Sequence, residues 1–167
     1  IPTVDRSLAG EVGYATDDGD FWATRSPVDG ASRIQAPTFL VAGSNDIFQR
    51  DTPLIYEQLK HQVNTKLVVL KGSHIGAVMA GALGADNLIS KGAPSSSALM
   101  LQWFDHYLKG MPNGAATLPN VTQFVEGYGA AGTTRYARAT DWPHPQMSPQ
   151  RWYLQSGGML KTSLPTL

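Results

Sequence analysis

Two residues of this sequence have the types and positions of the acid and base of a hydrolytic site. Asp46 lies six residues after Leu40 and His74 lies four residues after Leu70, so each follows a short apolar run. A histidine that acts as general base needs a carboxylate on the ring nitrogen facing away from the nucleophile, because that contact fixes the tautomer and stabilises the imidazolium. The order of acid before histidine is that of the α/β-hydrolase triad.

Each of the two residues also has a purely structural interpretation. Asp46 follows Ser44 and Asn45, and such an aspartate is typical of a turn or a helix cap. His74 could be a loop histidine bonded to a backbone carbonyl. Their joint position after two apolar runs favours the catalytic interpretation.

The two apolar runs, residues 36–41 and 66–70, have the pattern of strands buried on both faces of a parallel sheet. Between them the apolar spacing predicts an amphipathic helix over about residues 53–63, with Thr52 as its cap and Pro53 in its first turn. Strand, helix and strand in this order form a βαβ unit, so the strands should be parallel. Catalytic groups collect beyond the carboxyl ends of such strands, where Asp46 and His74 lie.

The rest of the chain divides into a second helix and a β-prone end. Ser95–Ser97 offer caps for a helix that ends at Gly110 and carries an apolar stripe of Leu101, Phe104 and Leu108. The glycine-rich stretch 77–92 fits a loop or a weak helix. Short β-prone pieces after residue 118 indicate an antiparallel β-rich domain. Residues 1–30 are expected to be irregular, with one short helix.

The nucleophile is missing from the pattern. The elbow motif G-x-S-x-G, which exposes a serine at a strand-to-helix turn, does not occur in the 167 residues. Ser44 and Ser73 lie beside the acid and the base instead of on such an elbow. The sequence therefore contains two members of a triad without the third.

Composition argues against several other classes of protein. Thirteen basic and thirteen acidic side chains give no basic surface for nucleic acid, and no apolar run approaches the ~20 residues of a membrane helix. The chain has no cysteine, and no His/Asp/Glu cluster has metal-site spacing, so we expect neither metal nor cofactor. The compartment is undecided, because a cytoplasmic and a secreted protein both fit. His61 and His106 are expected to be surface or partly packed residues, and His144 lies between prolines in a loop. Four tryptophans are expected to be core or domain-interface anchors: Trp22, Trp103, Trp142 and Trp152.

Several short strings occur in an order and spacing that resemble the CocE/NonD hydrolases, the group of X-Pro dipeptidyl-peptidases, cocaine esterase and α-amino-acid ester hydrolases. The resemblance covers nearly the whole chain. The strings are Asp20-Phe21-Trp22, Arg25-Ser26-Pro27, Ile34 with Ala36-Pro37, Gly43 with Asp46, Gly72-Ser73-His74, the run from Trp103 to Gly110, Trp142-Pro143, and Tyr153-Leu154 with Gly157-Gly158 and Leu160.

The resemblance implies an α/β fold: a partial α/β-hydrolase, with a parallel sheet and crossover helices, followed by the beginning of an all-β jelly-roll domain. Residues 1–30 would be the end of a cap and its return to the sheet, residues 31–117 the last part of the hydrolase domain, and residues 118–167 the start of the jelly roll. Asp46 and His74 fall on the family's triad acid and base.

We accordingly expect a serine hydrolase for acyl esters, amides or X-Pro peptides. In this hypothesis the chain is a fragment that supplies the Asp and His and is inactive alone, because a missing N-terminal hydrolase segment carries the serine. The alternative is a non-catalytic module that lacks the nucleophile and binds a partner or carbohydrate through its β-rich end.

Overall fold

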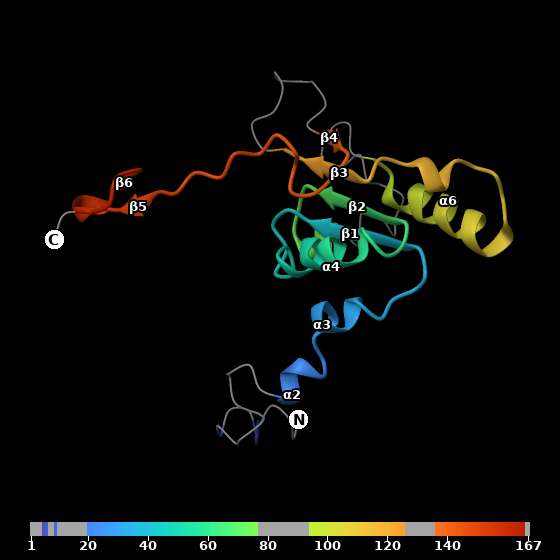
Figure 1. Ribbon diagram of the computed structural model, residues 1–167, viewed down its shortest axis with the longest axis horizontal. Helices are drawn as coiled ribbons and strands as arrows, with labels where there is room; N and C mark the ends of the chain where they lie inside the picture. The colour runs from blue at the N-terminus through green and yellow to red at the C-terminus, as the bar shows by residue number, and fades with distance from the viewer. Residues whose placement is uncertain (1–4, 7–8, 10–19, 77–93, 126–135, 166–167) are drawn as a thin grey trace.

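A four-stranded mixed sheet forms the centre of the computed structural model, which describes residues 5–6, 9, 20–76, 94–125 and 136–165 (Figure 1). The strand order is β1-β2-β3-β4. Strands β1 and β2 are parallel, β2 and β3 are parallel, and β4 is antiparallel to β3. The strands are β1 (Thr38–Gly43), β2 (Thr65–Leu70), β3 (Val121–Phe124) and β4 (Tyr136–Ala139).

The predicted parallel pair is confirmed, with Thr38 opposite Thr65 and Gly43 opposite Leu70. Strand β2 is buried almost throughout because it has a neighbour on each side. Strand β1 was expected to be buried on both faces, and most of it is only half-buried. The reason is its position at the edge of the described sheet, where it has a single neighbour.

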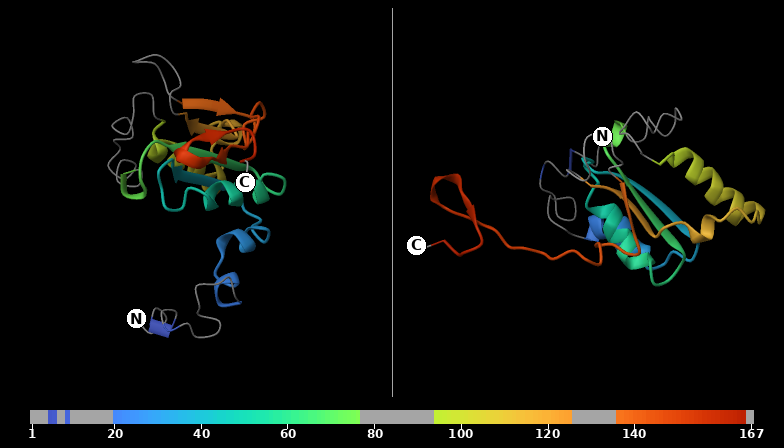
Figure 2. Two further views of the ribbon diagram at one scale, coloured as in Figure 1. Left: turned by 90° about the vertical axis from the view of Figure 1, so that its left-hand side faces the viewer. Right: turned by 90° about the horizontal axis from the view of Figure 1, so that it is seen from above.

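Two helices cover opposite faces of the sheet (Figure 2). Tyr56 of α4 (Asp51–Leu59) packs in a core cluster with Leu67 and Val121. Leu99 of α6 (Ser96–Lys109) packs against Val68, which follows Leu67 on β2 and so points to the other face. This layering of helices on a mainly parallel sheet is compatible with a partial α/β fold.

Helix α4 begins and ends earlier than the predicted range 53–63. The turns that follow Asp46 lead directly into it, since the Phe48 carbonyl accepts hydrogen bonds from the backbone N–H groups of Asp51 and Thr52. Thr52 therefore lies inside the first turn and is not the cap. Pro53 is in the first turn as predicted, where a missing N–H costs nothing.

Helix α6 has the predicted ends, but its apolar stripe is not the face that packs against the sheet. The Ser95 hydroxyl accepts a hydrogen bond from the Ala98 N–H, and Gly110 adopts the left-handed conformation with φ of 71°. Trp103 is buried against Phe39, whereas the apolar stripe of Leu101, Phe104 and Leu108 is exposed. The helix is apolar on two faces, and its spacing alone does not say which face meets the sheet.

Among residues 20–31 the structure has two short helices, α2 (Asp20–Ala23) and α3 (Pro27–Ala31), where one short helix was expected over residues 1–30. Ser26 caps α3, because its hydroxyl accepts a hydrogen bond from the Asp29 N–H. Helix α3 contacts α4 and leads into β1. The unassigned stretch 77–92 lies outside the described residues.

The predicted antiparallel pairing after residue 118 is present between β3 and β4, but both strands extend the sheet formed by β1 and β2. The remaining elements are η2 (Ala115–Thr117), the hairpin of β5 (Tyr153–Leu154) and β6 (Leu160–Lys161), and η3 (Ser156–Gly158) between them. The hairpin lies at the end of a long extended segment, well away from the sheet (Figure 1). The jelly-roll assignment and the domain boundaries stay predictions.

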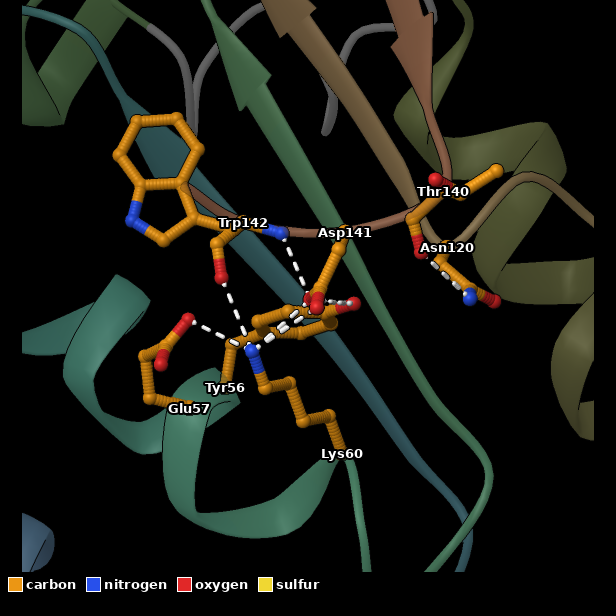
Figure 3. Close-up of polar contacts among 7 residues, drawn as sticks. All are labelled: Tyr56, Glu57, Lys60, Asn120, Thr140, Asp141 and Trp142. Atoms are coloured by element: carbon orange, nitrogen blue, oxygen red, sulfur yellow. Dashed lines mark hydrogen bonds and ion pairs between the residues drawn. The ribbon is translucent and has the colours of Figure 1, made fainter. Parts of the chain in front are cut away.

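A polar cluster fixes the chain where it leaves β4 (Figure 3). Lys60, the residue that follows α4, donates hydrogen bonds to both carboxylate oxygens of Asp141, at 2.9 and 3.1 Å, and to the Trp142 carbonyl at 3.1 Å. The Tyr56 hydroxyl donates to the same carboxylate at 3.4 Å, and Glu57 accepts a further bond from Lys60. The segment after β4 is thereby held against the C-terminal end of α4.

Candidate active site

Asp46 and His74 meet beyond the carboxyl ends of β1 and β2. The Asp46 Oδ2 atom lies 2.9 Å from the His74 Nδ1 atom, which is a hydrogen-bonding distance. The two residues are 28 positions apart in sequence and come together because their strands are parallel neighbours. The structure thus brings together the two residues that the sequence singled out.

Backbone contacts hold the two loops against each other. The Ser44 N–H donates to the Leu70 carbonyl at 2.7 Å, and the Asn45 N–H donates to the Gly72 carbonyl at 3.0 Å. At Gly43 a Cβ atom would stand 2.6 Å from the Gly72 carbonyl oxygen, so only glycine permits this approach. The acid loop and the histidine loop therefore form one unit.

The Asp46 carboxylate uses its two oxygens for different purposes. Oδ1 accepts a hydrogen bond from the Phe48 backbone N–H at 2.9 Å, which closes a turn of the kind expected from the structural interpretation. Oδ2 contacts His74. The Phe48 N–H lowers the pKa of Asp46 below its usual range, and the His74 contact acts in the same direction although burial opposes it. Asp46 is therefore ionised at neutral pH.

The ionised carboxylate fixes the proton on the His74 ring. A carboxylate can only accept hydrogen bonds, so Nδ1 must carry the proton that it donates to Asp46. In the neutral imidazole this leaves the lone pair on Nε2. No group among the described residues hydrogen-bonds Nε2, and the His74 side chain is 51% exposed while that of Asp46 is 9% exposed. The pair has the form of an oriented base that is open on its reactive side.

His74 also begins a helical turn that covers residues 74–76. The Ser73 hydroxyl caps this turn by accepting a hydrogen bond from the Gly76 N–H at 3.4 Å. The Ser44 hydroxyl donates to Asn45 Oδ1 and accepts from the Gly72 N–H. Both serines beside the pair thus have local structural contacts, as their positions off an elbow motif indicated.

Sequence reasoning passed over Phe48, whose ring lies against the His74 imidazole. The ring centroids are 5.4 Å apart in an edge-to-face arrangement. Ile47 and Ile75, which follow the acid and the base directly, are largely exposed. The sequence did contain a signal for this contact: apolar residues directly follow the candidate acid and the candidate base.

The other residues considered at first have separate roles. His106 donates from Nδ1 to the Met111 carbonyl at 2.8 Å, His144 accepts from the Gln146 N–H, and His61 is exposed. Trp103 is a core residue and Trp142 packs against the core, whereas Trp22 and Trp152 are exposed. Within the described ranges, no three His, Cys, Asp or Glu side chains gather as metal ligands would.

In the part of the chain that the structure describes, no helix has the length and apolar character needed to span a bilayer.

Comparison with known proteins agrees with the predicted resemblance. Residues 5–76 match the family model described as X-Pro dipeptidyl-peptidase (S15 family). The chain is 26% identical over 151 residues to cocaine esterase of Rhodococcus sp. (strain MB1 Bresler), an alignment that covers 88% of this chain. It is 25% identical over 177 residues to a Rhodopirellula baltica protein provisionally named as an Xaa-Pro dipeptidyl-peptidase, an alignment that covers 98% of this chain.

The chain spans about a quarter of the length of each of these two relatives, since the alignments cover 25% of each. The family match and the two similarities agree with the predicted resemblance to proteins of the CocE/NonD type.

Proposed function

From this relationship to the CocE/NonD-type hydrolases, we propose that the chain supplies the acid and the base of a Ser-Asp-His triad. The activity is hydrolysis of an acyl bond in an ester, an amide or an X-Pro peptide. These substrate classes follow the names of the family and of the two relatives. His74 is the general base and Asp46 is the residue that orients it.

The observation that carries this proposal is the 2.9 Å contact between Asp46 Oδ2 and His74 Nδ1 at the ends of neighbouring parallel strands. An aspartate on Nδ1 leaves Nε2 as the basic atom, and Nε2 is the atom that a serine hydroxyl must reach. The lowered pKa of Asp46 keeps the carboxylate charged when the imidazolium forms.

The reaction proceeds in two halves on this arrangement. Nε2 of His74 takes the proton of the serine hydroxyl as Oγ attacks the acyl carbon, and the imidazolium then protonates the leaving alcohol or amine. A water molecule next attacks the acyl-enzyme, with His74 again taking a proton and returning it to the serine Oγ. Asp46 stabilises the imidazolium in both halves without becoming protonated.

The serine and the oxyanion hole belong, in this proposal, to polypeptide outside the 167 residues. Two observations support it: the sequence has no G-x-S-x-G motif, and the relatives are about four times as long as the aligned segment. A jelly-roll domain that begins in the C-terminal part would wall one side of the pocket.

The test is fluorophosphonate labelling of the natively purified source protein, with peptide mapping to locate the adduct. We expect an adduct on a serine outside this sequence, in the same chain or in one tightly bound to it. No adduct at all would contradict the proposal and favour a module without a nucleophile.

Substitution of the two residues in the same source protein tests their roles. His74→Ala should lower acyl-ester turnover by at least about a thousandfold, and Asp46→Asn should lower it comparably because the amide favours the wrong tautomer. His61→Ala, at an exposed histidine, is the matched control and should retain full turnover. Substantial activity in His74→Ala would rule out its assignment as the base.

A further inference from the structure

Phe48 contacts both members of the Asp46–His74 pair. Its backbone N–H donates to Asp46 Oδ1 at 2.9 Å, and its ring lies edge-to-face with the His74 imidazole at a centroid distance of 5.4 Å. The two contacts come from one residue, so the turn that orients the carboxylate also sets the position of the ring.

The imidazole needs such lateral support because its own surroundings leave it free to rotate. The His74 side chain is 51% exposed, and its contact with Asp46 is its single hydrogen bond to a described residue. Rotation of the ring about its bond to Cβ would break that hydrogen bond and turn Nε2 away. The Phe48 ring is the aromatic group that stands against this rotation in the described part of the chain.

Exposure also argues that the Phe48 ring has a role beyond core packing. The residue is 51% exposed, so it contributes little to the buried cluster of the sheet. An aromatic pair of this geometry adds an attraction beyond the burial of area. This energy favours one orientation of the imidazole over its rotated forms.

We propose that Phe48 is a positioning residue: its backbone N–H holds the carboxylate and its ring holds the imidazole in the orientation that pairs Nδ1 with Asp46. The proposal rests on the proposed function for its catalytic meaning, but the positioning itself is a property of this chain. It predicts that loss of the ring loosens the pair while the Asp46 turn survives, because the N–H belongs to the backbone.

The test is proton NMR of the chain at neutral pH, observing the downfield Nδ1–H resonance of His74 and its exchange with solvent. Phe48→Ala and Phe48→Leu should speed this exchange about twofold to tenfold, the factor that corresponds to the loss of one aromatic pair. Phe48→Tyr keeps the ring and should restore the wild-type exchange rate. Phe48→Leu keeps the measurement decisive if the alanine variant is poorly folded.

Phe104→Ala is the matched control, because Phe104 is 54% exposed on α6 and has no contact with the pair. It should leave the resonance unchanged. An unchanged exchange rate in both Phe48→Ala and Phe48→Leu would overturn the positioning role, even if His74→Ala abolishes turnover. Faster exchange in the Phe48 variants, together with full turnover in His74→Ala, would uphold the positioning role and overturn the catalytic one.

Discussion

At the scale of single residues, the candidate site depends on the absence of a side chain at Gly43, which lies beside the Gly72 carbonyl. A Cβ at position 43 would stand 2.6 Å from that oxygen, and the atom in its way belongs to the backbone and cannot rotate aside. The two loops must then separate, which also separates Asp46 from His74.

Gly43→Ala should therefore lower the free energy of unfolding by about 1–3 kcal/mol, the usual cost of overpacking. The midpoint of urea denaturation measures the change in stability, and loss of the His74 Nδ1–H resonance would show that the two loops have separated. Gly76→Ala is the control, since among the described residues its Cβ would meet the Ser73 hydroxyl at an ordinary 3.4 Å. Equal stability of both variants would show that the loops can separate without cost.

The carboxylate of Asp46 predicts a dependence of stability on pH. Its pKa is lowered in the folded chain by the Phe48 N–H and by His74, so it binds a proton less readily there than in the unfolded chain. The stabilisation is present above the unfolded value of about 3.9 and is lost as the pH falls through the lower folded value.

Asp46→Asn should remove this loss of stability at acidic pH. The difference in unfolding free energy between the natural chain and the variant should therefore shrink as the pH falls. Urea denaturation at a series of acidic pH values measures it. A constant difference across that range would mean that the carboxylate contributes no charged contact.

Much of the pair was predictable from residues alone. Asp46 and His74 follow apolar runs that could be recognised as parallel strands, and parallel neighbours place their ends together. The contribution of Phe48 was not predictable, because a side chain two residues past an aspartate gives no sign of which ring it will meet. That contact depends on how the loop after β2 packs against the loop after β1.

At the scale of elements, the cluster of Tyr56, Lys60 and Asp141 joins α4 to the segment after β4 (Figure 3). Burial acts against the charge of each ion, but their mutual hydrogen bonds raise the pKa of Lys60 and lower that of Asp141. The Lys60 side chain is largely buried, unlike that of Lys109, which pairs with Asp105 at the exposed end of α6.

Lys60→Met should lower the free energy of unfolding by about 1 kcal/mol and speed hydrogen exchange at the Trp142 amide, because Asp141 loses its cation. Lys109→Met is the matched control and should change neither quantity measurably. Unchanged exchange at Trp142 in Lys60→Met would show that the segment is held by other contacts.

Tyr56 makes the stability of the fold depend on pH in the alkaline range. Burial, followed by the charge of Asp141, raises the pKa of Tyr56 to about 12. An acid with a raised pKa stabilises the fold fully below the unfolded value, near 10, and loses that stabilisation as the pH rises through about 12.

Tyr56→Phe should therefore show a shallower fall of unfolding free energy between these two pH values than the natural chain. Denaturation curves at alkaline pH measure it, and Tyr153→Phe on the distant hairpin serves as the control. If the unfolding free energies of Tyr56→Phe and of the natural chain fell equally over this pH range, the raised pKa of Tyr56 would be contradicted.

The elements themselves could be predicted to different degrees. The capping serine and the terminal glycine of α6 are local signals, and both predictions hold. Which face of α6 meets the sheet, and that β3 pairs with β2, depend on contacts distant in sequence. Local periodicity contains no information on such partners, so the apolar stripe at Leu101, Phe104 and Leu108 did not reveal that Trp103 is the buried residue.

At the scale of the whole molecule, the chain has a central sheet and an arm that extends from it to the β5–β6 hairpin (Figure 1). The hairpin has two strands of two residues each, and a two-stranded hairpin alone is at best marginally stable. The stability of the sheet should therefore not depend on it.

Removal of residues 148–167 should change the free energy of unfolding of the sheet by less than about 0.5 kcal/mol. Trp142→Ala, at a side chain that packs against the core cluster, should by contrast cost about 2 kcal/mol. Circular dichroism during urea denaturation measures both. A large loss on truncation would mean that the hairpin folds back onto the sheet in solution.

The open side of β1 has a consequence for how the isolated chain behaves in solution. The strand's six residues include no charged side chain, and an uncharged sheet edge is a template to which identical chains can add. Equal numbers of acidic and basic residues also leave little mutual repulsion between molecules near neutral pH. Solubility should accordingly be lowest around neutrality, with aggregates that grow by edge-to-edge addition at β1.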